Sequence, residues 1–356
     1  MKHTILSAII ATCALTAMAQ LPIQLQPEKF NDYALNYYLP QTTTEIEFVA
    51  SKTTHKAGQY YKYARKYLGT TDVITEDSES WQLEGATILV RSRANTEQRY
   101  QLTFKAGQTP YIFVNEEHII LSANTAPDPF AIDTFPATAP NIMNDIDMTQ
   151  ALSEEILMSG SVAKMAEMAA KQIYRIRESR MDILTGEADN MPADGESMKI
   201  IIEQLDRQEK ALTAMFTGYT TVEYTTKRIK YTPTDDVENQ ILLRFSKHQG
   251  FVAPDNLSGN PIYLSVAVTE RGEYPLDNKG IVKKVPKGAL AYNIPGKAVM
   301  SLRYDNKTIA RKELSVAQLG VVFGLDPALL THKKEPTYII FNPHTGGIMQ
   351  IGTISE

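Results

Sequence analysis

The feature that most limits the possible folds is a pair of helical patterns set into a chain that otherwise shows strand patterns. Apolar residues recur every three or four positions over residues 151–184 and again over 194–216, as in amphipathic helices. A short loop containing Gly186 and Pro192 separates the two patterns. We therefore predict an antiparallel helical hairpin over residues 151–218.

The segments on either side of the hairpin show the patterns of strands. Residues 42–52 alternate, with Ile46 and Phe48 on one face, and many short β-type runs with frequent turns follow residue 218. We therefore predict an α+β fold in which two mainly antiparallel β regions are separated by the long antiparallel helical hairpin. The predicted parts are a signal peptide (1–19), an N-terminal β-rich region with one short helix (20–123), an Ala/Pro/Thr linker (124–150), the hairpin (151–218) and a C-terminal β-sandwich-like domain (219–356).

Local patterns add expectations inside these parts. Residues 21–40 contain three prolines, so we expect an irregular lead-in. Residues 59–68 have helical spacing, and Gly69 is expected to end that helix. Residues 314–330 are expected to hold a short helix and a loop. Asp305-Asn306 is typical of a hairpin turn.

The first residues indicate export. A basic start at Lys2 is followed by a short apolar run, and Ala17-Met18-Ala19 fits a small-x-small cleavage site. The run is shorter than the roughly 20 apolar residues that span a bilayer. One alternative is a buried N-terminal helix, and another is a lipoprotein anchored at Cys13. We favour cleavage after Ala19 and a location in the periplasm or at the cell surface.

Composition and missing motifs exclude several chemistries. Cys13 is the only cysteine, so cleavage after Ala19 would remove thiol nucleophiles, zinc–thiolate sites and iron–sulfur clusters. The formal net charge is -5, without a basic stripe, so we predict no nucleic-acid partner. Phosphate loops, dinucleotide glycine patterns and a hydrolase serine elbow are missing. We predict no catalytic residue, no metal site and no cofactor.

The loop of the predicted hairpin and its flanks form the first candidate site. Its residues are polar or charged: Arg177, Arg180, Glu187, Asp189 and Asp194. Carboxylate oxygens suit a hard cation such as calcium, although the spacing departs from an EF-hand loop. We favour the alternative, an ordered loop in which Asp194 caps the second helix and arginines pair with carboxylates.

A second candidate is an aromatic face formed by Tyr60, Tyr63 and Tyr67, which share one side of a helix. Exposed tyrosine rings would suit a carbohydrate. We favour packing of this face on a neighbouring sheet, because tyrosine buries its ring and keeps its hydroxyl wet. Among the histidines, none has a metal-ligand spacing, and His344 is expected at the surface in a hairpin turn.

Short motifs in a fixed order carry a resemblance to a known family. The motifs are Tyr61 to Gly69, Asp72 to Ser78, Tyr174 to Arg180, Leu184 to Asp189, Met191 to Gly195, Phe216 to Gly218, Tyr292 to Gly296 and Ala317 to Gly320. Over nearly the whole mature chain the sequence resembles the exported bacterial family catalogued as domain of unknown function 4831. The resemblance implies export in Gram-negative bacteria and no particular activity, substrate or catalytic residue.

Three hypotheses for function remain. The favoured one is a non-catalytic envelope protein that binds a protein or a glycan. The second is a glycan-directed hydrolase whose carboxylates come from different strands, since such acids meet only in the fold. The third is a structural homo-oligomer through the hairpin, for which the methionine-rich face of Met158, Met165 and Met168 would have to be exposed.

Overall fold

The computed structural model describes most of the chain. The described residues are 23–25, 28–30, 32–104, 110–127, 130–142, 151–191, 195–332 and 336–354, with side chains from residue 34 onward. The predicted signal peptide, Cys13 and the proposed cap Asp194 lie outside these ranges. In the part that is described, no helix combines the length and the apolar character that crossing a membrane requires.

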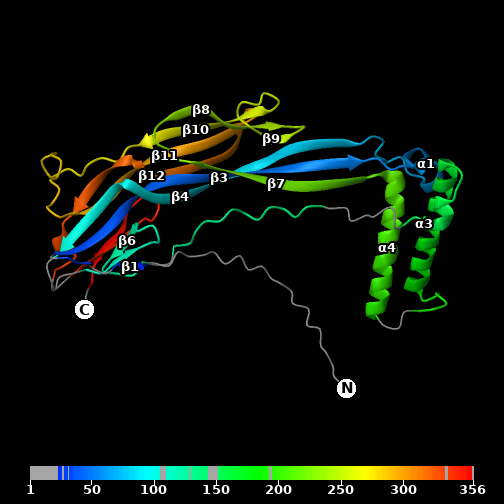
Figure 1. The fold of residues 1–356 in the computed structure, drawn as a ribbon, viewed down its shortest axis with the longest axis horizontal. Coiled ribbons are helices and arrows are strands. Elements are labelled where there is room, and N and C mark those ends of the chain that lie inside the picture. The colour runs from blue at the N-terminus through cyan, green and yellow to red at the C-terminus, as the bar shows by residue number, and fades with distance from the viewer. Residues whose placement is uncertain are drawn as a thin grey trace, which may run out of the picture.

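A long β ribbon is the backbone of the molecule (Figure 1). Its central strand is β3 (Asp32–Lys56), which pairs antiparallel with β4 (Ser78–Phe104) on one edge and with β7 (Tyr219–Tyr231) on the other. At about 3.3 Å per residue, the 25 residues of β3 span roughly 80 Å. The prediction of an irregular lead-in over residues 21–40 is therefore wrong, because residues 23–25, 28–30 and 32–40 form strands. The ladder register shifts between Tyr38 and Pro40, and this irregularity accommodates a residue that has no N–H to donate.

Two further antiparallel sheets flank the ribbon. One has the order β1-β5-β6-β13-β14 and the other β12-β11-β10-β8-β9, while β2 pairs with the start of β3. Their strands are β1 (Ile23–Leu25), β2 (Glu28–Phe30), β5 (Ile112–Val114), β6 (Ile120–Ala123), β8 (Val237–Ser246), β9 (Gly250–Val252), β10 (Asn260–Glu270), β11 (Leu290–Tyr304), β12 (Lys307–Leu325), β13 (Thr337–Phe341) and β14 (Ile348–Thr353).

The two β regions that the helices separate in sequence are joined in space. Strand β7 follows the helices, and all of its residues pair with residues 44–56 of β3. In the same way, β13 pairs with β6. The predicted mixed α and β composition with antiparallel sheets is confirmed. The helical hairpin is an insertion between paired strands, and Figure 1 shows it at one end of the ribbon, with both helices running across the ribbon's direction.

Three apolar cores follow one another along β3 and the turn after it. Leu35 and Leu39 pack with β5, β6 and β13, whereas Ile46 and Phe48 pack with the sheet that contains β10 and β11. Past the end of the strand, Tyr60 packs with the helices. The ribbon therefore links two sandwich-like cores of the body to a third, helical core.

The helical elements fit their sequence signals with two differences. The predicted first helix is broken at Gly160 into α2 (Glu154–Leu157) and α3 (Val162–Thr185), and the second helix is α4 (Gly195–Thr217). Upstream, residues 59–68 form a 3₁₀ turn, η1 (Tyr61–Tyr63), that continues into α1 (Ala64–Leu68). Gly69 ends α1 in the left-handed conformation, with φ of 71°, as predicted. A second 3₁₀ turn is η2 (Pro327–Leu329).

The C-terminal half contains one wrong element and one confirmed turn. Residues 314–330 are predicted to hold a short helix and a loop, but residues 314–325 continue the 19-residue strand β12, and the helical turn in this range is η2. Leu314 and Val316 are buried while Glu313 and Ser315 are exposed, which is the period-two burial of a strand. Asp305 and Asn306 have φ of 46° and 61° between β11 and β12, which confirms the predicted hairpin turn.

Candidate functional site

The hairpin of α3 and α4 is an antiparallel pair whose seam contains charged residues. The apolar positions Ile202, Leu205, Leu212 and Phe216 of α4 are three, seven and four residues apart, and Glu209 divides the gap of seven into four and three. On α3, Arg180 follows Ile173 and Ile176 at the same type of spacing. A polar pair in an otherwise apolar seam fixes the register of two helices.

An arginine–carboxylate cluster occupies this position. Nε of Arg177 lies 2.6 Å from Oε1 of Glu209, and Nη1 of Arg180 lies 2.6 Å from Oε2 of the same carboxylate. Arg180 also contacts Oδ1 of Asp206 at 2.5 Å. The side chain of Glu209 is 14% exposed, so this carboxylate is well shielded from solvent and accepts from both arginines. The Asp206 and Glu209 contacts raise the pKa of Arg180 above its usual value.

A polar groove of about 480 Å³ opens beside the cluster. Its lining residues come from both helices: Arg177, Arg180, Asp206, Glu209, Lys210, Thr213, Ala214 and Thr217. The two carboxylates stand three residues apart on one helix and are both engaged by arginine. The cluster therefore favours a structural role that locks the two helices together.

The structure separates the residues predicted as one polar loop site. Arg177 and Arg180 pair with Asp206 and Glu209 of α4, which the sequence prediction did not include. Glu187 and Asp189 are exposed near the end of α3, where the backbone N–H of Glu187 donates to the carbonyl of Asp182. Among the described residues no group of three or more histidine or acidic side chains is placed to hold a metal ion. Asp194 lies outside them, so its capping role stays a prediction.

The three residues of the predicted aromatic face differ in burial. Tyr60 is 1% exposed and packs on Phe216 of α4, with ring centroids 5.4 Å apart. Tyr63 and Tyr67 are partly buried against the helical core, and the hydroxyl of Tyr174 donates to the carbonyl of Tyr67 at 2.8 Å. Packing of this face is confirmed, but the surface it covers is the helical hairpin and not a sheet.

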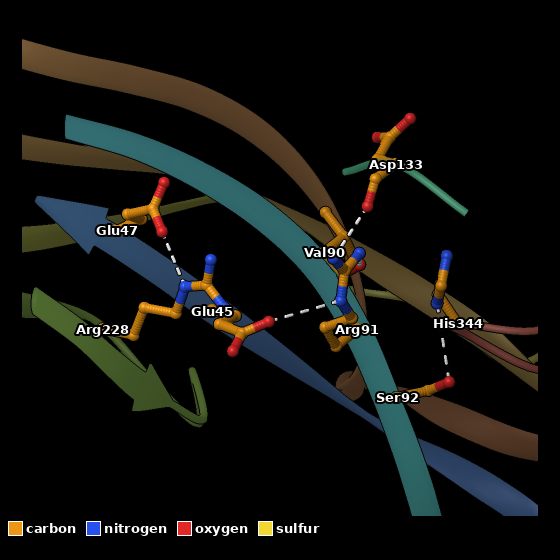
Figure 2. A network of polar contacts seen from close by, with 8 residues as sticks. All are labelled: Glu45, Glu47, Val90, Arg91, Ser92, Asp133, Arg228 and His344. Atoms are coloured by element: carbon orange, nitrogen blue, oxygen red, sulfur yellow. Dashed lines mark hydrogen bonds and ion pairs between the residues drawn. The ribbon is translucent and has the colours of Figure 1, made fainter. Parts of the chain in front are cut away.

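A second polar network lies on the ribbon, outside the hairpin (Figure 2). Glu45 and Glu47 project from one face of β3 and meet Arg91 at 3.6 Å and Arg228 at 2.6 Å. Glu47 is 2% exposed, so Arg228 neutralises a buried charge. Asp133, from the extended segment 130–142, accepts from Arg91 through its backbone carbonyl at 2.7 Å.

The extended segment 130–142 is held along the ribbon by these arginines and by β7. The ring of Phe135 lies 4.8 Å from the guanidinium carbon of Arg228. Farther along, Ile142 and Val222 of β7 exchange two backbone hydrogen bonds. These residues fall within the predicted linker, and they lie extended against the ribbon.

His344 differs from its predicted surface position. It lies in the turn between β13 and β14, as expected, but it is partly buried. Burial lowers the pKa of its imidazole below the usual value, and the nearby charge of Arg91 acts in the same direction. Nδ1 lies 3.5 Å from Oγ of Ser92 (Figure 2).

The two halves of the hairpin differ in burial. We define the base half as residues 162–177 and 206–217, and the tip half as residues 178–191 and 195–205. Ten buried apolar residues belong to the base half, whereas Ile183 is the one buried apolar residue that the structure describes in the tip half. The tip half instead exposes large apolar side chains: Met181, Leu184, Met191, Ile200 and Ile201.

Comparisons with known proteins place the chain in a family. No curated protein and no solved structure matches the sequence. The model of a family described as a domain of unknown function, DUF4831, matches residues 33–349, which include the ribbon, the hairpin and most of the C-terminal strands. Because this match spans most of the sequence, the chain belongs to the DUF4831 family.

Proposed function

We propose that this chain is a non-catalytic binding protein of the cell envelope, and that the tip half of its helical hairpin docks a protein partner. The observation that carries the proposal is the exposure of aliphatic and methionine side chains there. Met181, Leu184 and Ile200 are 59%, 58% and 53% exposed. Met181 and Leu184 are neighbours one turn apart on α3, and apolar side chains gathered on a surface are characteristic of interaction sites.

The position of the hairpin supports a docking role. The hairpin is attached through its base half to one end of the β ribbon (Figure 1). A short, partly packed helical pair in water depends on tertiary contacts for its stability. The tip half has few such contacts within the described residues, and a partner would supply them.

The chemistry of the tip favours a protein over a glycan. Aromatic rings are the usual platforms for sugars, but Tyr60 is buried, and Tyr63 and Tyr67 are partly buried in the helical core. Methionine and branched aliphatic side chains, in contrast, suit adaptable packing against another protein surface.

Site-specific photocrosslinking in the native cells tests the proposal. We expect a crosslinker at position 184 or 201 to capture a protein, and a second substitution, Ile200→Glu, to remove the product. Position 257 is a matched control, because Leu257 is 82% exposed and lies between β9 and β10, outside the helices. Equal capture at positions 201 and 257 would contradict docking through the tip.

The envelope location is tested separately. We expect the protein in the periplasmic or surface fraction, with Gln20 as its first residue. A cytoplasmic product that retains Met1 would contradict export. A lipid-modified Cys13 would replace cleavage after Ala19 with the lipoprotein alternative.

A further inference from the structure

We propose that the hairpin's partner is a second copy of this chain, packed so that the tip half of each hairpin lies against the base half of the other. This inference rests on the proposed docking role of the hairpin and names its occupant. A twofold dimer requires a self-complementary surface. Where one patch of the first copy contacts a different patch of the second copy, the same contact occurs again with the two copies exchanged.

The charges of the hairpin are segregated along its length. The tip half carries six acidic residues against two basic ones, Arg180 and Lys199; the acids are Glu178, Asp182, Glu187, Asp189, Glu196 and Glu203. The base half carries six basic residues against three acidic ones; the basic residues are Lys164, Lys171, Arg175, Arg177, Arg207 and Lys210. An antiparallel pair of hairpins would therefore set an acidic half against a basic half at both ends.

The charges available for such contacts are not consumed inside the chain. Within the described ranges, none of the six tip acids forms an ion pair, and Arg175, Arg207 and Lys210 of the base form none. Side-by-side contact of two tip halves would bring like charges together, which is unfavourable. Charge complementarity thus selects the tip-to-base arrangement over the tip-to-tip arrangement.

Apolar side chains are exposed in both halves, as this arrangement needs. The tip presents Leu184 and Ile201, while the base presents Val162 and Tyr174, which are 54% and 50% exposed. Met158, just before α3, is 78% exposed. The predicted methionine face is only partly available, since Met165 and Met168 pack against the helical core.

The size and placement of the hairpin permit a stable contact. A helix of 24 residues is about 36 Å long, and two adjacent helices are roughly 20 Å wide, so one face offers about 700 Å². This is close to the roughly 800 Å² per partner of standard protein interfaces. Because the helices run across the ribbon (Figure 1), two hairpins can lie side by side with their ribbons leaving at opposite ends.

The first measurement is the mass of the purified protein in solution. We expect light scattering to give a dimer at micromolar concentration, and Ile201→Glu to give a monomer with an unchanged circular dichroism spectrum. A wild-type protein that is monomeric at every concentration tested would overturn the inference.

Charge reversal then tests the tip-to-base arrangement. The tip variant is Glu196→Lys with Glu203→Lys, and the base variant is Arg175→Glu with Arg207→Glu; all four side chains are exposed. We expect each variant alone to dimerise at least tenfold more weakly than the wild type. Mixed in equal amounts, the two variants should form a heterodimer, because both contacts again join opposite charges. A base variant that dimerises normally, or a mixture that forms no heterodimer, would overturn the arrangement.

Two outcomes separate this inference from the proposed function. If the protein is monomeric but crosslinkers at the tip capture a different protein in cells, the inference of a second copy is wrong and the proposed docking role stands. If the protein is monomeric and the tip captures nothing beyond the level at position 257, both proposals fail.

Discussion

The base and the tip of the hairpin are built from the same two helices, yet they differ in what holds them. At the base, Phe216 and Tyr60 form a buried core with α3, and the segments before α1 and α3 cover the helices. At the tip, helical spacing continues, but Ile183 is the one buried apolar residue that the structure describes, and several large apolar side chains face solvent. Helical spacing alone therefore does not tell which part of a helix is buried within the chain.

The largest expected effect is at the base. Phe216→Ala should lower the free energy of unfolding by about 3–5 kcal/mol, because it removes a fully buried ring and leaves a cavity. Urea denaturation followed by far-ultraviolet circular dichroism measures this change. A loss below about 1 kcal/mol would mean that the base is not the packed half.

The boundary between the two halves should show an intermediate effect. Glu209→Ala should cost about 1–2 kcal/mol, because Arg177 and Arg180 lose their shared acceptor and solvent only partly compensates for it. The same denaturation experiment applies. Glu203→Ala is the matched control, since Glu203 is exposed and makes no ion pair among the described residues; equal losses would remove the special role of Glu209.

Acidification should lower the free energy of unfolding through His344, which lies between β13 and β14. It should not change the difference between the base half and the tip half of the hairpin. Because burial lowers the pKa of folded His344, the unfolded chain binds a proton first as the pH falls below about 6.5. Stability should therefore fall with decreasing pH in that range and gain nothing above it. Urea midpoints at several pH values measure this dependence. The His344→Gln variant should show a weaker dependence, and an unchanged one would assign the effect to other groups.

The smallest effect is expected at the tip. In the monomer, Ile201→Ala should change the free energy of unfolding by no more than about 0.5 kcal/mol, as is usual for exposed sites. Ile173→Ala, the same substitution at a buried base position, should cost about 2–5 kcal/mol. Similar losses of unfolding free energy for Ile201→Ala and Ile173→Ala, measured in dilute protein, would contradict the difference between the base half and the tip half.

The hairpin was predictable because its signals are local. Helical spacing located both helices, and the glycines at positions 69, 186 and 218 end helices with positive φ. The length of β3 was not predictable in the same way, because Pro40 suggested a break that the ladder absorbs as an irregularity. Strand β12 was missed because Leu314 and Val316 are buried in a core that they share with Ile46 and Phe48 of β3, which lie far away in sequence.

The candidate site was predicted in part. Arg177 and Arg180 were identified, but their expected partners at Glu187 and Asp189 lie beyond the arginines at the end of α3. The seven residues from Arg180 to Glu187 would correspond to about 10 Å along a helix, whereas antiparallel pairing brings Glu209 directly opposite. The position of Glu209 in the apolar seam of α4 was the signal that could have identified it.

The close approach of α4 to the end of β3 has a consequence for the pairing of β7 with β3. The amide of Tyr60 donates to the carbonyl of Met215, and a side chain at Gly58 would collide with that carbonyl. Lys56 and Tyr219, which are paired in the ladder, are thus neighbours once the helices have formed. They are far apart in sequence, with β4, β5, β6 and the helices between them, so bringing them together costs loop-closure entropy. The contact of α4 with the turn after β3 offsets part of that entropy, because it holds the first residue of β7 beside the last residue of β3.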